Sequence, residues 1–110
     1  MDCIFCKIIA HELPSTVITE NEDILVIKDI APKAPIHYLI MPKKHIVDVL
    51  DLKKEDMFLA VKMVEMIQYV AKDRVKNHNF RLMVNNGAEV GQIIFHLHYH
   101  FLAGTKMSHF

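Results

Sequence analysis

This 110-residue sequence has no excess of charge of either sign and no long apolar run. Its 13 basic and 13 acidic side chains give a net charge of zero, which argues against nucleic acid or an anionic membrane as a bulk partner. No apolar run approaches the ~20 residues of a spanning helix. The first residues also lack the layout of a signal peptide, so we expect a cytoplasmic protein without membrane association.

Glycine and cysteine are scarce as well. The three glycines form neither of the glycine patterns, Walker or Rossmann, that hold phosphate groups. The two cysteines, Cys3 and Cys6, favour free thiols or a metal site over a structural disulfide in a cytoplasmic protein. Because the chain has no repeat, linker or low-complexity segment, residues 1–110 are predicted to form one domain with one core.

Hydrophobic patterning predicts an α+β fold. The long helix should begin near residue 53 after an N-cap at Asp51, end near 76 and bury a stripe that includes Met57, Val64 and Ile67. The order of helix, three strands, long helix and two strands predicts an antiparallel sheet of about five strands with one long and one short helix. The short helix is expected at 4–10, and the strands at 16–19, 24–28, 36–41, 80–85 and 94–102.

The segment from His96 to Leu102 carries the strongest chemical signal, because three histidines alternate there with apolar residues. On a strand they would share one face, with neighbours about 6.5 Å apart. Three interpretations are open at this point. The imidazoles could be hydrogen-bonded structural groups, zinc ligands of the His-x-His type, or a nucleophile with neighbours that fix its tautomer and move a proton.

Two further groups of residues could bind ligands. Cys3 and Cys6 would need two more ligands for zinc, and His45 and His96 are candidates; buried thiols are the alternative. Redox use is disfavoured because no strand precedes Cys3. Asp29 follows a predicted strand, where it could accept hydrogen bonds from a ribose diol or cap the proline-containing loop after it.

Taken together, these segments resemble the histidine triad (HIT) family, in its histidine triad nucleotide-binding (Hint) branch. His96 to Leu102 satisfies every position of the motif His-φ-His-φ-His-φ-φ, where φ is hydrophobic. Residues 29–46, with Ala34-Pro35-Ile36-His37 and Pro42-Lys43-Lys44-His45, closely resemble the central segment of that branch, as do residues 4–9 and 81–85. The similarity covers nearly the whole chain.

The resemblance implies a homodimer with one continuous sheet and an activity like that of adenosine 5′-monophosphoramidases. Such enzymes hydrolyse purine nucleoside phosphoramidates (AMP and GMP derivatives) or acyl-adenylates to the nucleoside monophosphate. By this likeness, His98 is the nucleophile that forms a nucleotidyl-histidine, His100 assists the leaving group or water, and His37 and His96 support the site. The implied nucleotide-binding residues are Phe5, Ile8, Asp29, Ile30, Leu39, Asn85, Gln92, Ile94, His98 and His100.

Some members with Cys-x-x-Cys near the N-terminus bind zinc, and the resemblance implies Cys3, Cys6, His45 and His96 as its ligands here. This zinc would be structural, and no metal would be required for catalysis. The third histidine, His100, favours a hydrolase, because the transferases that the family resembles more distantly have glutamine at that place.

Ile93 departs from the pattern, since this branch commonly has serine or threonine there, and isoleucine supplies no hydrogen bond. We therefore expect weakened turnover, and leaving-group preference is open because the tryptophan-containing tail of some members is also missing. The alternatives to the phosphoramidase are a nucleotide-binding regulatory or scaffold protein with little turnover, a dinucleoside polyphosphate hydrolase of the same superfamily, and a zinc hydrolase.

Overall fold

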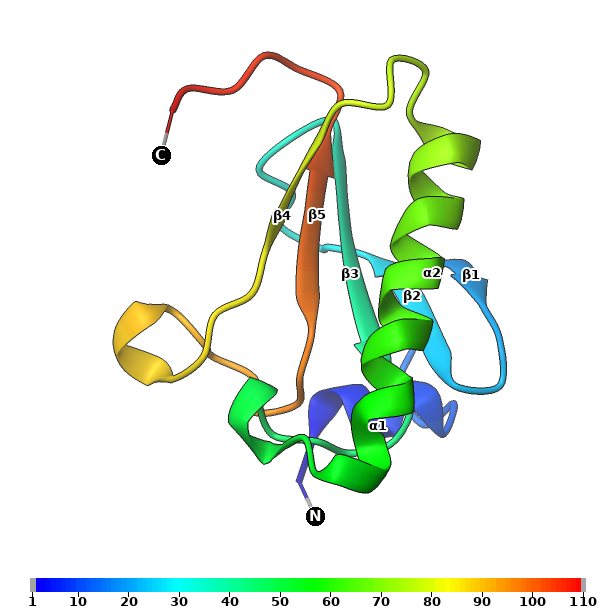
Figure 1. Cartoon of the computed structure of the whole chain (residues 1–110), viewed down its shortest axis with the longest axis vertical. Coiled ribbons are helices and arrows are strands. Elements are labelled where there is room, and N and C mark those ends of the chain that lie inside the picture. Colours follow the sequence, from blue (N-terminus) through cyan, green and yellow to red (C-terminus); the bar gives the residue numbers. More distant parts are fainter. Residues whose placement is uncertain (1, 110) are drawn as a thin grey trace.

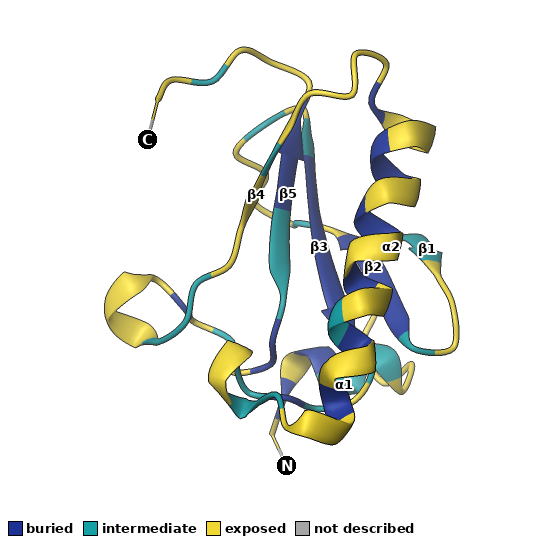
Figure 2. Ribbon diagram, in the orientation of Figure 1, coloured by how far each residue is buried: buried dark blue, intermediate teal, exposed yellow. Residues whose placement is uncertain are grey.

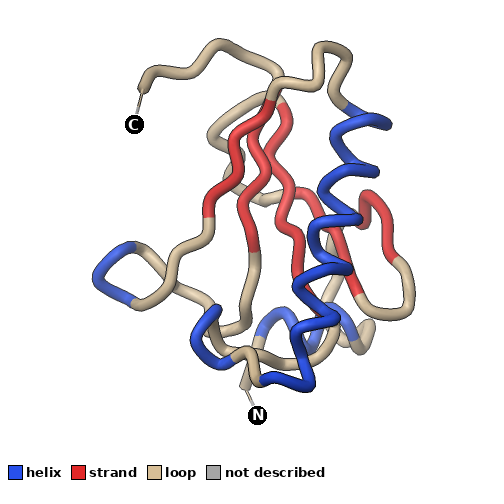
Figure 3. Tube along the Cα trace, viewed as in Figure 1, coloured by secondary structure: helices blue, strands red, loops and turns tan. Residues whose placement is uncertain are grey.

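The computed structural model of the chain describes residues 2–109 and has the α+β architecture expected from the sequence. Five strands form one antiparallel sheet in the order β1-β2-β3-β5-β4 (Figures 1 and 3). The strands are β1 (Val17–Glu20), β2 (Ile24–Lys28), β3 (Ile36–Pro42), β4 (Phe80–Met83) and β5 (Tyr99–Ala103). The helices are α1 (Ile4–Ile9) and α2 (Met57–Arg74), and short 3-10 turns lie at Val49–Asp51, Lys54–Asp56 and Ala88–Val90.

The two faces of the sheet carry different apolar clusters. Helix α2 covers one face, where Ile40 and Phe101 are fully buried against Met63 and Val70 of the helix (Figure 2). Because side chains alternate along a strand, Leu39 and the histidines of β3 and β5 point to the opposite face. Phe5 of α1 covers part of that face, in a cluster with Leu39, Met41, Leu25 and Ile27. The histidine chemistry therefore lies on the α1 side of the sheet.

The predicted start and buried stripe of the long helix are partly wrong. Asp51 is not its N-cap, because the Asp51 carboxylate accepts the Val47 N–H at 2.9 Å and the helix begins only at Met57. Ile67 is buried as expected, whereas Met57 and Val64 are about half exposed, at 49% and 50%. The helix is apolar on two sides, so periodicity alone did not identify the side that packs on the sheet. The buried side consists of Leu59, Met63, Met66, Ile67, Val70 and Ala71.

The last strand is shorter than the alternation of histidines predicts. It begins at Tyr99, so only His100 of the three histidines lies within it, and the prediction of one strand over 94–102 is wrong. The segment before it is held by loop contacts, since the Leu97 N–H donates to the Ile46 carbonyl at 2.6 Å and Leu97 packs with Ile46 and Leu59. His96 and His98 are therefore placed by a loop rather than by the pleat of a sheet.

Within residues 2–109, no helix combines the length and apolar character needed to cross a bilayer.

Candidate active site and metal centre

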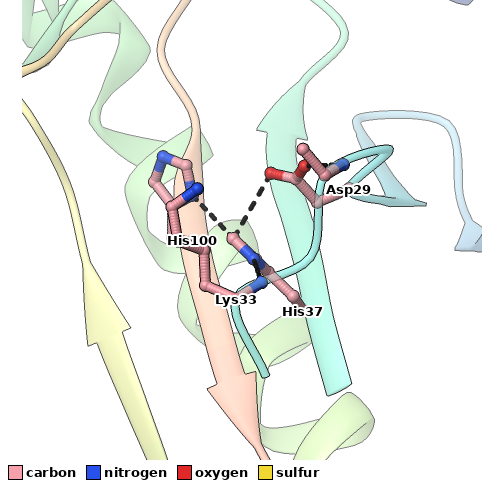
Figure 4. A network of polar contacts seen from close by, with 5 residues as sticks. Asp29, Lys33, His37 and His100 are labelled. Atoms are coloured by element: carbon pink, nitrogen blue, oxygen red, sulfur yellow. Dashed lines mark hydrogen bonds and ion pairs between the residues drawn. The ribbon is translucent and has the colours of Figure 1, made fainter. Parts of the chain in front are cut away.

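His37 and His100 form the centre of a polar chain on the α1 side of the sheet (Figure 4). His37 of β3 is paired with Leu102 of β5, so His100, two residues away on the same face, is its diagonal neighbour. The His37 Nε2 atom lies 3.0 Å from His100 Nδ1 and 3.3 Å from Asp29 Oδ2. The other Asp29 oxygen accepts the Ala31 N–H at 2.8 Å, which orients the carboxylate.

The hydrogen bonds determine the tautomers of these rings. The backbone N–H of Lys33 donates to His37 Nδ1 at 3.0 Å, so that atom carries a lone pair and the proton of the neutral ring is on Nε2. The His37 Nε2–H is thus directed at His100 Nδ1 and at the Asp29 carboxylate. Since His100 Nδ1 is then an acceptor, the neutral His100 ring holds its proton on Nε2. His100 can therefore donate from the nitrogen that faces away from His37.

His98 has the opposite tautomer. Its Nδ1 lies 2.7 Å from the carbonyl oxygen of His96, and a carbonyl only accepts, so Nδ1–H donates and Nε2 keeps a lone pair. The ring packs edge-on against Phe5 at a centroid distance of 5.0 Å and lies 5.1 Å from the ring of His100. A ring nitrogen with a free lone pair and a ring N–H donor therefore lie on neighbouring imidazoles.

Burial keeps these rings neutral. It lowers the pKa of His98 below the ordinary value and lowers the pKa of His100 to about 4, where the nearby His98 and His37 act in the same direction. Burial also lowers the pKa of His37, although the Asp29 carboxylate opposes the change. At pH 7 the His98 Nε2 lone pair is consequently free to attack an electrophile.

The first histidine of the motif belongs to a separate cluster. His96 is completely buried, and its Nε2–H donates to the Pro42 carbonyl at 2.7 Å. Its Nδ1 lone pair faces the sulfur atoms of Cys3 and Cys6 at 3.4 and 3.6 Å, and Cys6 Sγ lies 3.3 Å from His45 Nδ1. The four ligand atoms all lie within 4.8 Å of one another. Burial lowers the pKa of His96 to about 4, so its ring is neutral, as a metal ligand must be.

This geometry fits zinc. In a tetrahedral site with bonds of about 2.0–2.3 Å, neighbouring ligand atoms are separated by roughly 3.3–3.8 Å. The three separations of 3.3, 3.4 and 3.6 Å lie in this range. Two thiols and two imidazoles form a common ligand set for structural zinc, and the Pro42 carbonyl fixes the orientation of His96. All four ligands named from the sequence are therefore gathered at one place.

The remaining predicted nucleotide-binding residues differ in how far they are buried. Phe5 and Leu39 are buried in the cluster next to the histidines, and Ile8 and Ile94 pack against it. Ile30 is fully exposed, and Asn85 is partly buried, its amide within 3.5 Å of where a Cβ on Gly91 would stand. Their roles toward a nucleotide stay predictions.

Gln92 has a structural function that the sequence did not reveal. Its side chain is 4% exposed, accepts the Gly87 N–H at 2.8 Å and donates to the carbonyls of Val47 and Ile94. It thereby connects the loop before β5 to the segment after β3. Its neighbour Ile93 is 85% exposed and lies on the outside of that loop. The sequence also could not predict that the Lys33 N–H and the carbonyls of Pro42 and His96 bind the histidines, because side-chain identity does not show what a backbone group binds.

The comparisons with known proteins identify the family of this chain. The family model described as scavenger mRNA decapping enzyme C-term binding matches residues 2–110. An uncharacterized HIT-like protein of Synechocystis sp. is 42% identical over 107 residues, which cover 97% of this chain and 94% of that protein. The chain belongs to the histidine triad family.

Solved structures of histidine triad proteins superpose closely on this chain. A HIT family hydrolase from Clostridium thermocellum has a TM-score of 0.92 at 42% identity, with 97% of this chain and 94% of that chain covered. A histidine triad protein from Clostridium difficile has a TM-score of 0.94 at 40% identity, with coverage of 100% and 96%. The HIT fold predicted from the sequence is thereby confirmed.

The assigned tautomers lead to a prediction for NMR. At pH 7 the ¹⁵N spectra of the imidazoles should show His98 protonated at Nδ1 and both His37 and His100 protonated at Nε2. His100 should stay neutral until the pH approaches its pKa of about 4, whereas in urea the same ring should titrate near 6.5. A native His100 ring that protonates near pH 6.5, or that carries its proton on Nδ1, would contradict the assignment.

The same low pKa links stability to pH. Between pH ~6.5 and ~4 the unfolded chain binds a proton at His100 that the folded chain does not, so the free energy of unfolding falls as the pH falls through this window. His100→Asn should reduce that slope, and the control His109→Asn, at an exposed residue, should not. Urea denaturation at several pH values measures both slopes.

Proposed function

We propose that this HIT protein is a nucleotide-binding hydrolase that cleaves purine nucleoside phosphoramidates or acyl-adenylates to the nucleoside monophosphate. The observation that carries the proposal is the pair of opposite tautomers at His98 and His100. The His98 Nδ1–H is bound by the His96 carbonyl, and the His100 Nδ1 is bound by His37. One Nε2 is left as a nucleophile and the neighbouring Nε2–H as a donor. The hydrolase name of the Clostridium thermocellum relative supports the same class of activity.

In the first step, the His98 Nε2 lone pair attacks the α-phosphorus and forms a P–N bond while the bond to the leaving group breaks. An amine leaving group accepts a hydrogen bond from His100 Nε2–H and leaves as the neutral amine with a proton from solvent, whereas the carboxylate of an acyl-adenylate leaves without one. The positive charge on the His98 imidazole is stabilised by its Nδ1–H bond to the His96 carbonyl. In the second step, water attacks phosphorus, the P–N bond breaks, His98 Nε2 recovers its lone pair, and the proton of the water is released to solvent.

The other parts of the site have roles in positioning the nucleotide. Asp29 has its carboxylate next to His37 and is proposed to accept hydrogen bonds from the ribose. Phe5 and Leu39 form an apolar surface beside the histidines and are proposed to contact the base, with Ile8 and Ile94 at its edge. Ile30, Asn85 and Gln92 are proposed to contribute to nucleotide binding through the loops that they occupy.

A second candidate function is a nucleotide-binding protein with little turnover. It is favoured by Ile93, which places an exposed apolar side chain where this branch of the family commonly has a hydroxyl group. A missing transition-state donor can lower the rate by ~10²-fold or more. Because both candidate functions require binding of the nucleotide, only turnover distinguishes them.

The hydrolase proposal predicts that His98→Ala lowers kcat/KM for an adenosine phosphoramidate by ~10⁴-fold, because the nucleophile is lost. His109→Ala, at an exposed residue, is the matched control and should have wild-type activity. Single-turnover release of AMP is the measurement, made with and without chelator. Wild-type protein that binds the nucleotide without releasing AMP would overturn the hydrolase proposal in favour of the second candidate, and loss of activity with chelator at an unchanged melting temperature would favour the zinc hydrolase.

We also propose that Cys3, Cys6, His45 and His96 hold a zinc ion. With four protein ligands it would be a structural ion that joins α1 to the loop after β3 and to the loop before β5. It would supply no water for catalysis. Its further effect would be to hold the backbone of His96, whose carbonyl orients His98.

The zinc proposal predicts about one zinc per chain by elemental analysis of protein purified without chelator. Cys6→Ala and His45→Ala should lose the metal and melt at a lower temperature, and His109→Ala, at an exposed residue, should do neither. Cobalt exchanged into the site should show the absorption of thiolate-bound tetrahedral Co²⁺. Metal-free wild-type protein, or full zinc content in Cys6→Ala, would contradict the proposal.

A homodimer is the third part of the proposal. On α2, Met57, Phe58, Val61 and Val64 are each about half exposed, at 49–59%. Strand β4 lies at an edge of the sheet, and its Phe80, Leu82 and Met83 are also exposed. An unpaired edge strand next to apolar side chains is suited to pairing with a second copy, which would continue the sheet.

This arrangement predicts that Val61→Asp with Val64→Asp, or Leu82→Asp alone, converts a dimer into a monomer, because a buried carboxylate would be unpaired. Val17→Asp on the opposite edge strand β1 is the control, since Val17 is exposed to a similar degree at 46%. Light scattering gives the mass. Wild-type protein that is monomeric at micromolar concentration would refute the dimer.

A further inference from the structure

Cys3 and Cys6 form a second reactive pair besides the histidines, at the start of α1. They are the two cysteines of the chain, and both are free thiols. Cys3 is the N-cap of α1, and its Sγ accepts the Cys6 N–H at 3.3 Å. The Cys3 side chain is therefore bent over the first turn of the helix toward Cys6.

The two sulfur atoms are close enough for a small movement to join them. They contact the same atom, His96 Nδ1, at 3.4 and 3.6 Å, and lie within 4.8 Å of each other. Residues three apart on a helix have Cβ atoms about 5–6 Å apart, and a disulfide needs about 3.5–4.5 Å. Because α1 has only six residues and Cys3 lies just outside them, its first turn can tighten by this amount.

The two thiols differ in their access to small reagents. Cys3 is 7% exposed and packs with Phe5 and Leu39, whereas Cys6 is only partly buried. A thiol that binds a metal ion is deprotonated, and the thiolate is the nucleophilic form. A small oxidant would therefore react first with Cys6, and the Cys3 sulfur would lie beside the product.

From this geometry we propose that Cys3 and Cys6 are a site of reversible oxidation, at which hydrogen peroxide closes a disulfide between them and expels zinc. The release of metal rests on the zinc site proposed above, whereas the disulfide needs only the two thiols. The pair is a target of oxidation and not a thioredoxin-like dithiol enzyme, because α1 is the first element of the described chain and no strand leads into it.

The oxidation has two steps. The Cys6 thiolate attacks one oxygen of the peroxide, so that an S–O bond forms, the O–O bond breaks and hydroxide leaves. The Cys3 thiolate then attacks the Cys6 sulfur, so that the S–S bond forms, the S–O bond breaks and a second hydroxide leaves. The sulfur atoms lose two electrons in total, and the peroxide gains them. Since a disulfide carries no charge, zinc keeps only its two imidazole ligands and dissociates.

The disulfide would act on the histidine site through His96. This ring is completely buried, and its Nδ1 lone pair would then face neither a metal ion nor an S–H donor. An unpaired buried acceptor is unfavourable, so the segment that carries it would loosen. The His96 carbonyl, 2.7 Å from His98 Nδ1, would no longer fix the His98 ring. We expect kcat for an adenosine phosphoramidate to fall about tenfold or more, with less effect on KM.

The first test uses protein purified without chelator and treated with hydrogen peroxide. Free thiols are then blocked with iodoacetamide, the mass of the chain is measured, and released zinc is followed with a chromogenic chelator. We expect both thiols to escape alkylation together, the chain to lose two hydrogen atoms, and zinc to appear at the same rate. A chain that gains oxygen on one cysteine and keeps the other thiol free would overturn the proposal. Protein without zinc would contradict the zinc site, and the masses would still decide on the disulfide.

Methionine oxidation is the competing effect, because the chain has seven methionines. Dithiothreitol with added zinc should restore the thiols, the metal and the turnover, since a dithiol reduces a disulfide but not a methionine sulfoxide. A loss of zinc or turnover that persists after dithiothreitol would overturn the proposal.

Cys6→Asp is the matched variant. A carboxylate can replace the thiolate as a zinc ligand but cannot form a disulfide. This variant should therefore keep its zinc in peroxide, and release at the wild-type rate would overturn the proposal. The masses of the wild-type chain decide if the variant binds no metal.

The link to the histidine site has its own readout, which does not depend on turnover. In the reduced protein the ¹⁵N spectrum of His98 should show the Nδ1–H tautomer alone, and in the disulfide form a mixture of both tautomers. The amides of Met63 and Val70, on the other side of the sheet, should not shift, which shows that the fold is kept. An unchanged His98 tautomer in the disulfide form would overturn the link. Reduced protein without turnover would count against the hydrolase only.

Discussion

The hydrogen bond from His98 Nδ1–H to the His96 carbonyl is the constraint on which the rest of the site depends. It fixes the His98 ring and assigns the free lone pair to Nε2, and in the proposed reaction it would stabilise the positive charge that develops on the ring. The carbonyl can do this because the loop is held at neighbouring points, by the His96 ring on the Pro42 carbonyl and by the Leu97 N–H on Ile46. The cluster of Cys3, Cys6, His45 and His96 is therefore connected to the His98 ring through the backbone of one residue. In the proposed mechanism it links the N-terminal helix to the nucleophile and takes no part in the chemistry.

The second histidine chain is arranged by the sheet itself. Antiparallel pairing of β3 and β5 brings His37 and His100 to within 3.0 Å, and the Lys33 N–H determines which nitrogen of His37 carries the proton. Asp29 shares that proton, so a group proposed to hold the ribose also contacts the chain of hydrogen bonds that ends at His100. In the proposed function, binding of the sugar and positioning of the His100 ring thus depend on the same carboxylate. The apolar cluster around Phe5 and Leu39 excludes water from one side of these rings and lowers their pKa values.

Much of this arrangement could be predicted from the sequence, and the failures have definite causes. The four members of the candidate metal cluster could be named because cysteine and histidine are the usual ligands of structural zinc, and the strands at 24–28 and 36–41 follow from apolar runs bounded by turns. Alternation of His96, His98 and His100 was misleading about the strand, because loop contacts of Leu97 and His96 override the pleat. The buried side of α2 could not be predicted, since Met57 and Val64 are as apolar as the residues that pack on the sheet. The backbone groups that bind the histidines could not be predicted, because they do not depend on the identity of the side chain.

The measurement that tests the central claim most directly is the position of the covalent bond. Wild-type protein is mixed with an adenosine phosphoramidate, quenched within one turnover under alkaline conditions, and the modified peptide is examined by mass spectrometry and by ³¹P NMR. The account predicts one adenylyl group, on His98 and attached through Nε2, because Nδ1 is bound to the His96 carbonyl. An adenylyl group on His100, or attachment through Nδ1 of His98, would contradict it, as would AMP release without any protein-bound intermediate.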